Sequence, residues 1–193
     1  MHYSLTVSSQ PAAEPLSTLE AKQHLRVDHN ADDTYIDGLV KAARINAETY
    51  LRRSLINTTW VMKMDCFPSV IRPPRSPLSS VSSLTYLDTD GTSQTLTVNT
   101  DYVVDSSSEP GRIYPAYGTS WPSTRAIENA VTLTFVAGYG TAGSNVPQSI
   151  RQALLLMVGT WYEQREGVVI GTITAELPMA VESLLASERI IEA

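Results

Sequence analysis

Two stripes of apolar residues with helical spacing bracket a middle section of quite different character. The first stripe lies in residues 36–51 and the second in residues 150–162, and each places its apolar side chains on one face of a helix. From residue 58 onward, β-branched and aromatic residues, prolines and glycines replace that period. This order predicts a helical core that carries a β insertion, not the alternating strands and helices of a parallel α/β fold.

The N-terminal helical part has clear start signals. Ser17 is followed three residues later by Glu20, which predicts a capping box at the start of a short helix. The acidic turn at residues 28–33 then breaks this helix and supplies N-terminal carboxylates for a longer helix through Leu51. Within that longer helix we expect Arg44, like the other charged residues, to face away from the buried stripe.

The middle section predicts a small antiparallel β region. Residues 58–64 read as a strand because they are rich in β-branched and aromatic side chains. The sequence Asp88-Thr89-Asp90-Gly91 between two strand-like runs predicts a hairpin, since Asp and Gly tolerate the backbone of tight turns. Further strands are expected at residues 101–104, 112–114 and 130–136.

These elements predict the α+β fold class. The expected architecture is a small helical bundle (two N-terminal helices, one long and one short C-terminal helix) with an inserted antiparallel β region. The expected parts are a flexible N-terminal arm at residues 1–15, a core at residues 16–177 and a C-terminal docking segment at residues 178–193. Within the core, the helical parts are residues 16–56 and 147–166, and the β insertion is residues 57–140.

Charge and composition argue against nucleic acids and membranes as binding partners. The 193 residues include 14 basic and 20 acidic side chains, which gives a formal net charge of −6. Binding to the phosphate backbone of nucleic acids draws on clustered Lys and Arg, which this chain lacks, so a DNA-binding module is disfavoured. No apolar run approaches the roughly 20 residues that cross a bilayer, and we expect no membrane partner.

One glycine motif suggests an enzyme. Gly138-x-Gly140-x-x-Gly143 lies between a strand and a helix, where a dinucleotide site would need glycines, and residues 168–174 offer a possible next strand. Against this, the helix starts at Pro147, several residues after the glycines, and the preceding segments form hairpins. We interpret the motif as a strand-to-helix loop and keep a nucleotide-binding enzyme using the Gly138–Gly143 loop as an alternative.

No other pattern predicts catalysis or metal binding. Asp28-x-Asn30-x-Asp32 begins like a calcium loop, but Asp33 stands where that loop needs glycine and Leu39 where it needs glutamate. The histidines lack a second ligand at metal-binding spacing, and a Gly-x-Ser-x-Gly motif is absent. We therefore expect no catalytic residue, no metal site and no cofactor.

Aromatic residues gather in a segment rich in proline and glycine. They are Tyr114, Tyr117 and Trp121. Such residues are enriched at protein interfaces because they combine a large contact area with a polar group. From the residues alone, two interpretations stay open: these side chains cover the β region, or they contact a neighbouring subunit.

Taken together, these segments resemble the tailed-bacteriophage head–tail connector (adaptor) family, in particular its longer members with a β insertion. The resemblance covers residues 16–189 and rests on the order and spacing of several motifs. These motifs are LEAKQHLRVD at residues 19–28, YI to YL at 35–51, PRSPLSSV at 74–81, YLDTDG at 86–91, FVAGYG at 135–140, IRQA at 150–153 and WYEQRE at 161–166.

The resemblance implies a structural virion subunit and not an enzyme. It implies a ring of about twelve copies, closed by repeated heterologous contacts, that sits below the portal protein. The ring would present a platform to the next tail-proximal connector or stopper protein, and DNA would pass through its lumen without specific binding. The chain would be made in the host cytoplasm and act at the head–tail junction of the virion. The alternative within this class is another tail-completion protein.

The two ends of such a subunit are expected to become ordered on docking. In the C-terminal segment, Leu184, Leu185 and Ile190 belong to a short amphipathic pattern. We expect these three side chains to anchor the segment on the portal.

Overall fold

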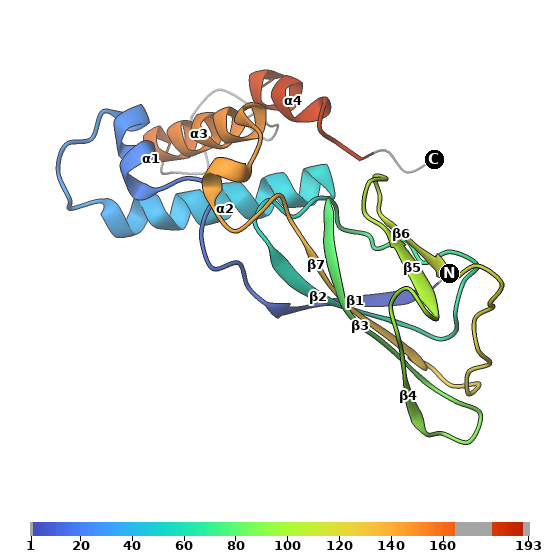
Figure 1. Ribbon diagram of the computed structural model, residues 1–193. Coiled ribbons are helices and arrows are strands. Elements are labelled where there is room, and N and C mark those ends of the chain that lie inside the picture. Colours follow the sequence, from blue (N-terminus) through green and yellow to red (C-terminus); the bar gives the residue numbers. More distant parts are fainter. Residues whose placement is uncertain (1, 165–178, 191–193) are drawn as a thin grey trace. The chain divides into compact units, whose positions relative to one another are not determined.

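The computed structural model describes residues 2–164 and 179–190, and the chain divides into two compact units. The β unit comprises Met1–Pro11 and Asn57–Tyr139, and the helical unit comprises Ala12–Ile56 and Gly140–Ala193. Figure 1 shows the helices and strands of each unit. The α+β class predicted from the sequence is confirmed, and all strands of the antiparallel sheet except the first lie between the N-terminal and C-terminal helices in the sequence.

The described residues of the helical unit form four α-helices and a short 3-10 turn. They are α1 (Thr18–Leu25), α2 (Asp33–Leu51), η1 (Gly143–Asn145), α3 (Gln148–Glu163) and α4 (Met179–Ala186). The predicted capping box is present at α1, because the amide of Glu20 donates to Ser17 Oγ and Glu20 Oε2 accepts from the amide of Ser17 at 2.8 Å. Of the described helices, none is long and apolar enough to span a membrane.

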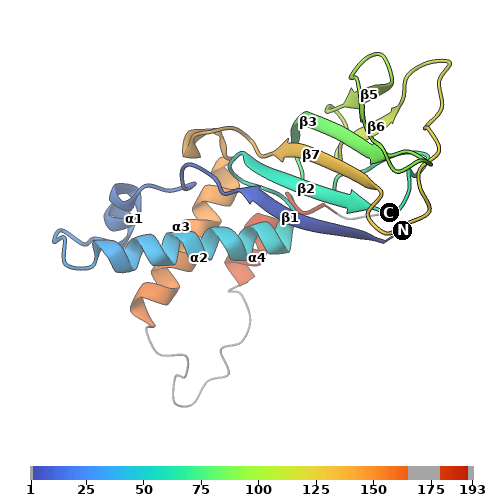
Figure 2. The same ribbon diagram turned by 90° about the horizontal axis from the view of Figure 1, so that it is seen from below.

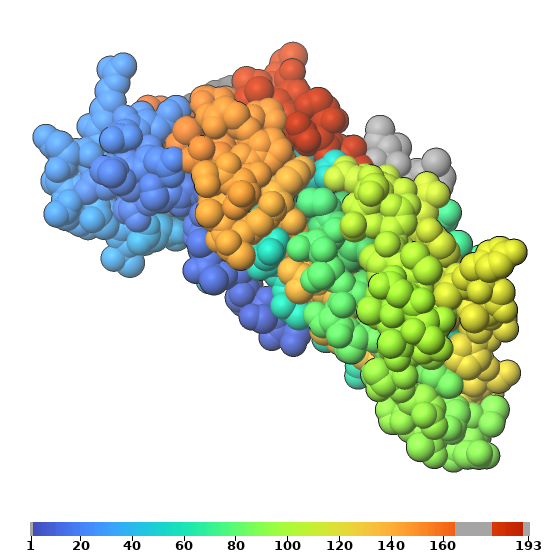
Figure 3. All heavy atoms as spheres, in the orientation of Figure 1, coloured from blue at the N-terminus to red at the C-terminus, as the bar shows by residue number. Residues whose placement is uncertain are grey.

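The core of the helical unit forms where α2 and α3 pack together. Their apolar stripes are buried as the helical spacing predicted. Helix α4 lies against α3 (Figure 3) and contributes two side chains without exposed surface, Val181 and Leu185. The buried residues on α2 and α3 are Ile36, Val40, Ala43, Ala47, Leu51, Ile150, Ala153, Leu154, Met157 and Val158.

The β unit holds a five-stranded antiparallel sheet in the order β1-β2-β7-β3-β4 and a separate pair, β5–β6. Figure 2 shows β1, β2, β7 and β3 side by side in that order. The bounds are β1 (Tyr3–Ser9), β2 (Thr58–Met64), β3 (Leu78–Leu87), β4 (Ser93–Leu96), β5 (Tyr102–Asp105), β6 (Arg112–Pro115) and β7 (Val131–Ala137).

The centre of this sheet follows the two-residue period of a strand with one buried face. In β7 the side chains of Val131, Leu133, Phe135 and Ala137 are buried, and the threonines between them are partly exposed. The predicted hairpin joins β3 to β4, and Asp88 Oδ1 accepts from the amides of the turn.

Residues 3–9 differ from the expected flexible arm, because they form strand β1. This strand pairs with β2 in a register that runs from Tyr3 opposite Met64 to Ser9 opposite Thr59. The pattern is weak in the sequence because only Leu5 of the strand is shielded, and serines and a threonine occupy exposed positions. An edge strand with two exposed faces lacks the alternation by which strands are recognised.

Candidate functional site

The three aromatic residues for which two interpretations stayed open, covering the β region or contacting another protein, separate into two groups within the β unit. The ring of Trp121 stacks on Phe67, with centroids 4.7 Å apart and planes 6° from parallel, and its Nε1 donates to the carbonyl of Ser69. Trp121 therefore covers the β region. Tyr117 is fully exposed, and Tyr114 is 38% exposed. These two tyrosines are free to contact another protein as far as the described residues are concerned.

The fully exposed ring of Tyr117 stands on a hydrogen-bonded turn. The amide of Thr119 donates to the carbonyl of Ala116 at 3.0 Å, and the amide of Ala116 donates to the carbonyl of Asp101 at 3.1 Å. Gly118, in the middle of the turn, has a φ of 77°, which a side chain would disfavour. A fixed turn that presents an aromatic ring to solvent is suited to protein contact and loses little entropy on binding.

The C-terminal segment at residues 179–190 is packed on the helical unit, which differs from the expected loosely held end. Of its three predicted anchors, Leu185 is completely buried, whereas Leu184 and Ile190 are partly exposed. The amide of Ile190 donates to the carbonyl of Leu51, and Nε of Arg53 donates to the carbonyl of Glu188 at 2.6 Å. Leu185 therefore belongs to the core of its own chain. Of the three predicted anchors, Leu184 and Ile190 have surface that another protein could contact.

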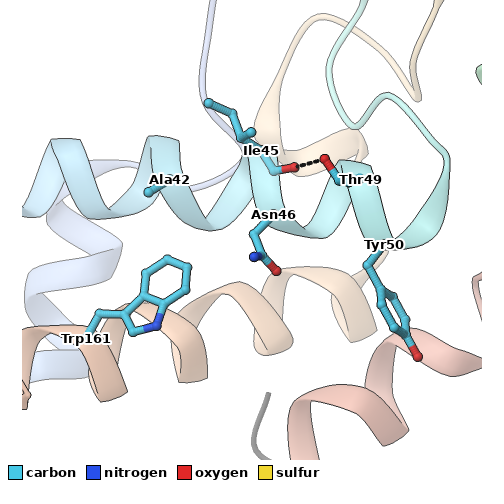
Figure 4. Close-up of a pocket in the computed structure, with 6 residues that line it drawn as sticks. All are labelled: Ala42, Ile45, Asn46, Thr49, Tyr50 and Trp161. Carbon is cyan, nitrogen blue, oxygen red and sulfur yellow. Dashed lines mark hydrogen bonds between the residues drawn. The ribbon is translucent and has the colours of Figure 1, made fainter. Parts of the chain in front are cut away.

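An open hollow of about 660 Å³ is lined by residues of α2 and α3 (Figure 4). Ile45, which is half exposed, and Trp161 of α3 are its largest apolar contributors. Trp161 belongs to the apolar stripe of residues 150–162, but it is only partly buried. The remaining lining residues are Ala42, Asn46, Thr49 and Tyr50, so the hollow contains no carboxylate, imidazole or amine. Its chemistry suits packing against another surface.

Two glycines of the Gly138–Gly143 loop lie in close contact with other residues of the same chain. A Cβ at Gly140 would lie 2.5 Å from Oδ1 of Asn145, and that oxygen accepts from the amide of Ala142 at 3.1 Å. A Cβ at Gly143 would lie 2.5 Å from the carbonyl oxygen of Pro15. Gly140 and Gly143 are therefore required by close packing inside the helical unit. The possible strand at residues 168–174 lies outside the described residues.

The amine of Lys22 binds the side chains of the acidic turn that begins like a calcium loop. Nζ of Lys22 lies 2.7 Å from both Asn30 Oδ1 and Asp33 Oδ1, and Asp32 accepts from the hydroxyl of Tyr162. In the part of the chain that the structure describes, no group of three or more His, Cys, Asp or Glu side chains is placed to hold a metal ion. The polar side chains of the turn therefore bind Lys22 of α1 and Tyr162 of α3.

A buried arginine is the main feature that the sequence did not predict. Arg44 was expected on the outer face of α2, yet it is only 4% exposed. Its Nε lies 2.6 Å from Glu14 and its Nη1 lies 2.9 Å from Glu48, which also accepts from the amide of Leu55. Burial lowers the pKa of Arg44, but the hydrogen bonds and charges of the two glutamates outweigh this and hold the pKa above its ordinary value.

This cluster explains the error in the sequence prediction. Glu48 is one turn away on α2, but Glu14 lies in the segment that was expected to be a flexible arm. The clamp ties that segment to α2 within the helical unit. The cluster has a structural role, because Arg44 forms ion pairs with both Glu14 and Glu48.

Comparison with known proteins finds a family model that matches part of the chain. Residues 17–99 match the family model described as Phage gp6-like head-tail connector protein, which confirms the resemblance seen in the sequence. No curated protein sequence matches the chain significantly.

Several solved structures share the fold over nearly the whole chain. A chain in the neck of an empty gene transfer agent (GTA) particle, computed with C6 symmetry, matches with a TM-score of 0.79 and 22% identity over 98% of this chain and 97% of that chain. A chain in the virion of a native GTA particle matches with a TM-score of 0.80 and 21% identity over 98% and 96%. A chain in the neck of a native GTA particle, computed with C12 symmetry, gives 0.76 and 20% over 100% and 97%.

Proposed function

Because residues 17–99 carry the head–tail connector family match, we propose that this chain is a structural virion subunit that joins the DNA-filled head to the tail. The observation that carries the proposal is the fold, which covers 98% of this chain and 97% of a chain in the neck of a GTA particle. The family match and the fold agree, although one comes from sequence and the other from structure. The proposed location is the head–tail junction of the virion.

The proposed assembly is a ring of about twelve copies closed by heterologous contacts. The C12 and C6 symmetries used for the related necks support repeated copies around an axis. In this proposal the portal protein lies above the ring and the next tail-proximal connector or stopper protein lies below it. A subunit in such a ring needs separate surfaces for its neighbours and for both partners.

The described surfaces suit these contacts in different ways. Leu184 and Ile190 present partly exposed apolar surface and are the proposed portal anchors, and Leu185 is withdrawn because it is buried. Tyr114 and Tyr117 are proposed to contact a neighbouring subunit or the tail side. If this is correct, replacing Leu184 and Ile190 with serine weakens attachment to heads while the chain stays folded.

DNA is proposed to pass through the ring without specific binding. The net charge of −6 and the small number of lysines favour a weak interaction with the phosphate backbone. Filter binding with duplex DNA should therefore detect no tight complex at physiological salt. A tight complex with steep salt dependence would instead favour a DNA-binding module.

The proposed role requires no catalysis. The relatives found by comparison are structural virion proteins, and the loop suggested for a nucleotide is filled by Asn145 and Pro15. A nucleotide-binding enzyme would be stabilised by its ligand through mass action, by about 2.7 kcal/mol at a hundredfold excess over Kd. We expect no shift in the thermal midpoint with ATP or NAD, and a clear shift would revive the alternative.

The proposal is tested by reconstitution of infectious or transducing particles. Heads made without this chain should be filled with DNA but unable to join tails, and adding the purified chain should restore joining. Restoration by a lysate that lacks the chain would contradict the proposal. If the heads already carry the next connector and only tail attachment fails, the chain is a different tail-completion protein.

A further inference from the structure

The two outer strands of the five-stranded sheet, β1 and β4, each have one unpaired side. Strand β1 pairs with β2 and strand β4 pairs with β3, and within the described residues no strand pairs with the other side of either one. Figure 2 shows β1 at the border of the sheet beside β2. The unpaired side of an edge strand presents backbone donors and acceptors to which another strand can add.

Neither edge carries the charges that usually prevent such pairing. Proteins protect exposed edges with charged residues, prolines, bulges or short strands. Strands β1 (Tyr3–Ser9) and β4 (Ser93–Leu96) contain no charged residue and no proline, and β1 has a bulge only near its end. Strand β4 has four residues, so it can pair with part of the seven-residue β1.

The two edge strands have matching faces. Leu5 of β1 and Leu96 of β4 both pack against the hydrophobic core of the β unit. Because successive side chains of a strand point to opposite faces, Thr6 and Thr95 lie on the other face of the sheet, where both are exposed. A sheet that continues from β1 into β4 of a second copy therefore keeps apolar side chains on one face and threonines on the other.

Apolar surface lies uncovered beside β1 on the core side of the sheet. Tyr3 is 48% exposed and Val7 is 39% exposed, and both alternate with the outward-facing Thr6. A pocket of about 320 Å³ opens next to Tyr3 and is lined by Met62, Met64 and residues 68–72. Methionine side chains adapt to the shape of a partner, and strand addition gains specificity from pockets that receive alternate side chains. The β1 edge therefore offers both backbone groups and an apolar pocket to an added strand.

We propose that β1 of one copy pairs with β4 of the neighbouring copy, so that the sheets of adjacent copies join around the ring. This inference rests on the proposed function, which includes the ring. A closed ring needs two different, complementary patches on each copy, because each copy binds one neighbour through each patch. The two edges are such patches, since they lie at opposite borders of one sheet.

The directions of the two strands agree with this arrangement. Four antiparallel pairings separate β1 from β4, so the two strands run in the same direction within one copy. Copies that repeat head to tail therefore bring β1 and β4 together as parallel strands. Pairing of β1 with β1 of a second copy would instead give an isologous dimer, which cannot continue around a ring.

Cross-linking within assembled rings tests which strands meet. Cys66 is the only cysteine and is exposed, so a Cys66→Ser background accepts single new cysteines. Copies carrying Thr6→Cys are mixed with copies carrying Thr95→Cys, assembled on DNA-filled heads that lack tails, and treated with a bis-maleimide. We expect a dimer that contains one copy of each kind. Ser106→Cys, in an exposed loop after β5, replaces Thr95→Cys in the matched control and should give no dimer.

A charge exchange tests whether the two edges act on each other. Thr6→Lys places a charge on the β1 edge and should lose the ring at the head vertex, with an unchanged circular dichroism spectrum. Adding Thr95→Glu to the same chain gives each contact between copies an opposite-charge pair and should restore the ring, whereas adding Thr95→Lys should not. Ser106→Lys is the control for added charge and should keep the ring.

The inference is overturned if unsubstituted copies form rings but the mixed dimer is absent, or if the Ser106→Cys control cross-links equally well. Dimers formed by Thr6→Cys copies alone would indicate isologous pairing and would also overturn it. The same holds if Thr95→Glu and Thr95→Lys have equal effects on the Thr6→Lys variant. These outcomes leave the proposed function intact. If unsubstituted copies do not bind the heads at all, the proposed function fails and the inference falls with it.

Discussion

Replacing Leu185 with alanine is expected to release helix α4 from the helical unit while α2 and α3 stay folded. Leu185 has no exposed surface, and with Val181 it forms the buried face of the helix. Removing a fully buried leucine side chain costs about 2–5 kcal/mol. A helix of eight residues does not persist in water without tertiary packing, so α4 depends on these contacts.

Other contacts of the C-terminal segment limit how much stability the Leu185→Ala substitution removes. Hydrogen bonds also hold the segment: Arg53 donates to the carbonyl of Glu188, the amide of Ile190 donates to the carbonyl of Leu51, and the hydroxyl of Ser149 donates to the carboxylate of Glu188. Each contributes about 0.5–1.5 kcal/mol, which does not replace the leucine. Because α4 lies near the end of the chain, the substitution raises the population of a locally opened state before it unfolds the whole unit.

Hydrogen exchange followed by mass spectrometry measures this directly. Amides in residues 181–186 of the Leu185→Ala variant should exchange more than about tenfold faster than in the parent, since 1.4 kcal/mol corresponds to a factor of ten. Amides in α2 should keep their protection. Leu184→Ala is the matched control, because Leu184 is partly exposed and its loss should cost less than about 1 kcal/mol.

Two results would refute this reasoning. If amides in α4 of Leu185→Ala exchange as slowly as in the parent, the helix does not depend on Leu185. If the Leu184→Ala control releases α4 instead, the two leucines have the opposite orientation, and Leu185 returns as a candidate anchor on the portal.

Four further predictions concern the helical unit. Arg44→Met should lower the free energy of unfolding by about 3–5 kcal/mol in urea, because two carboxylates lose their buried cation; a loss below 1 kcal/mol would contradict the clamp. Ser17→Ala should cost about 1 kcal/mol through loss of the helix cap. The backbone hydrogen bond from Ser17 lowers the pKa of Glu20 below its usual 4.5. The stability that the Glu20 carboxylate contributes is therefore present above pH 4.5 and is lost as the pH falls through the lower pKa of the folded state. Glu20→Gln should flatten this part of the plot of stability against pH. Gly140→Ala should cost more than about 1 kcal/mol in thermal denaturation, because its φ is 155° and its Cβ would collide with Asn145.

The elements with strong local patterns could be predicted from the sequence. Helix α2 shows a clear helical period, the start of α1 has a capping box, and the β3–β4 hairpin has an Asp-Gly turn. Each signal is contained in a few consecutive residues, so it does not depend on the rest of the fold. The family resemblance was also visible, because it depends on the order and spacing of such motifs.

The remaining features depend on contacts between distant residues. Arg44 is buried because Glu14, thirty positions earlier, supplies its counter-charge. Leu184 and Leu185 are neighbours of the same type, and only the packing of α4 on the helical unit decides which one is buried. Trp121 covers the β unit because Phe67 lies beneath its ring. None of these pairings leaves a periodic signal in the chain.

The most direct test of the connector role is co-sedimentation of the purified chain with DNA-filled, portal-bearing heads that lack tails, followed by electron microscopy. We predict a new ring of density at the portal vertex, with repeated copies around the axis of the vertex. Heads that show no added density, while tail-side proteins attach to them normally, would contradict the account.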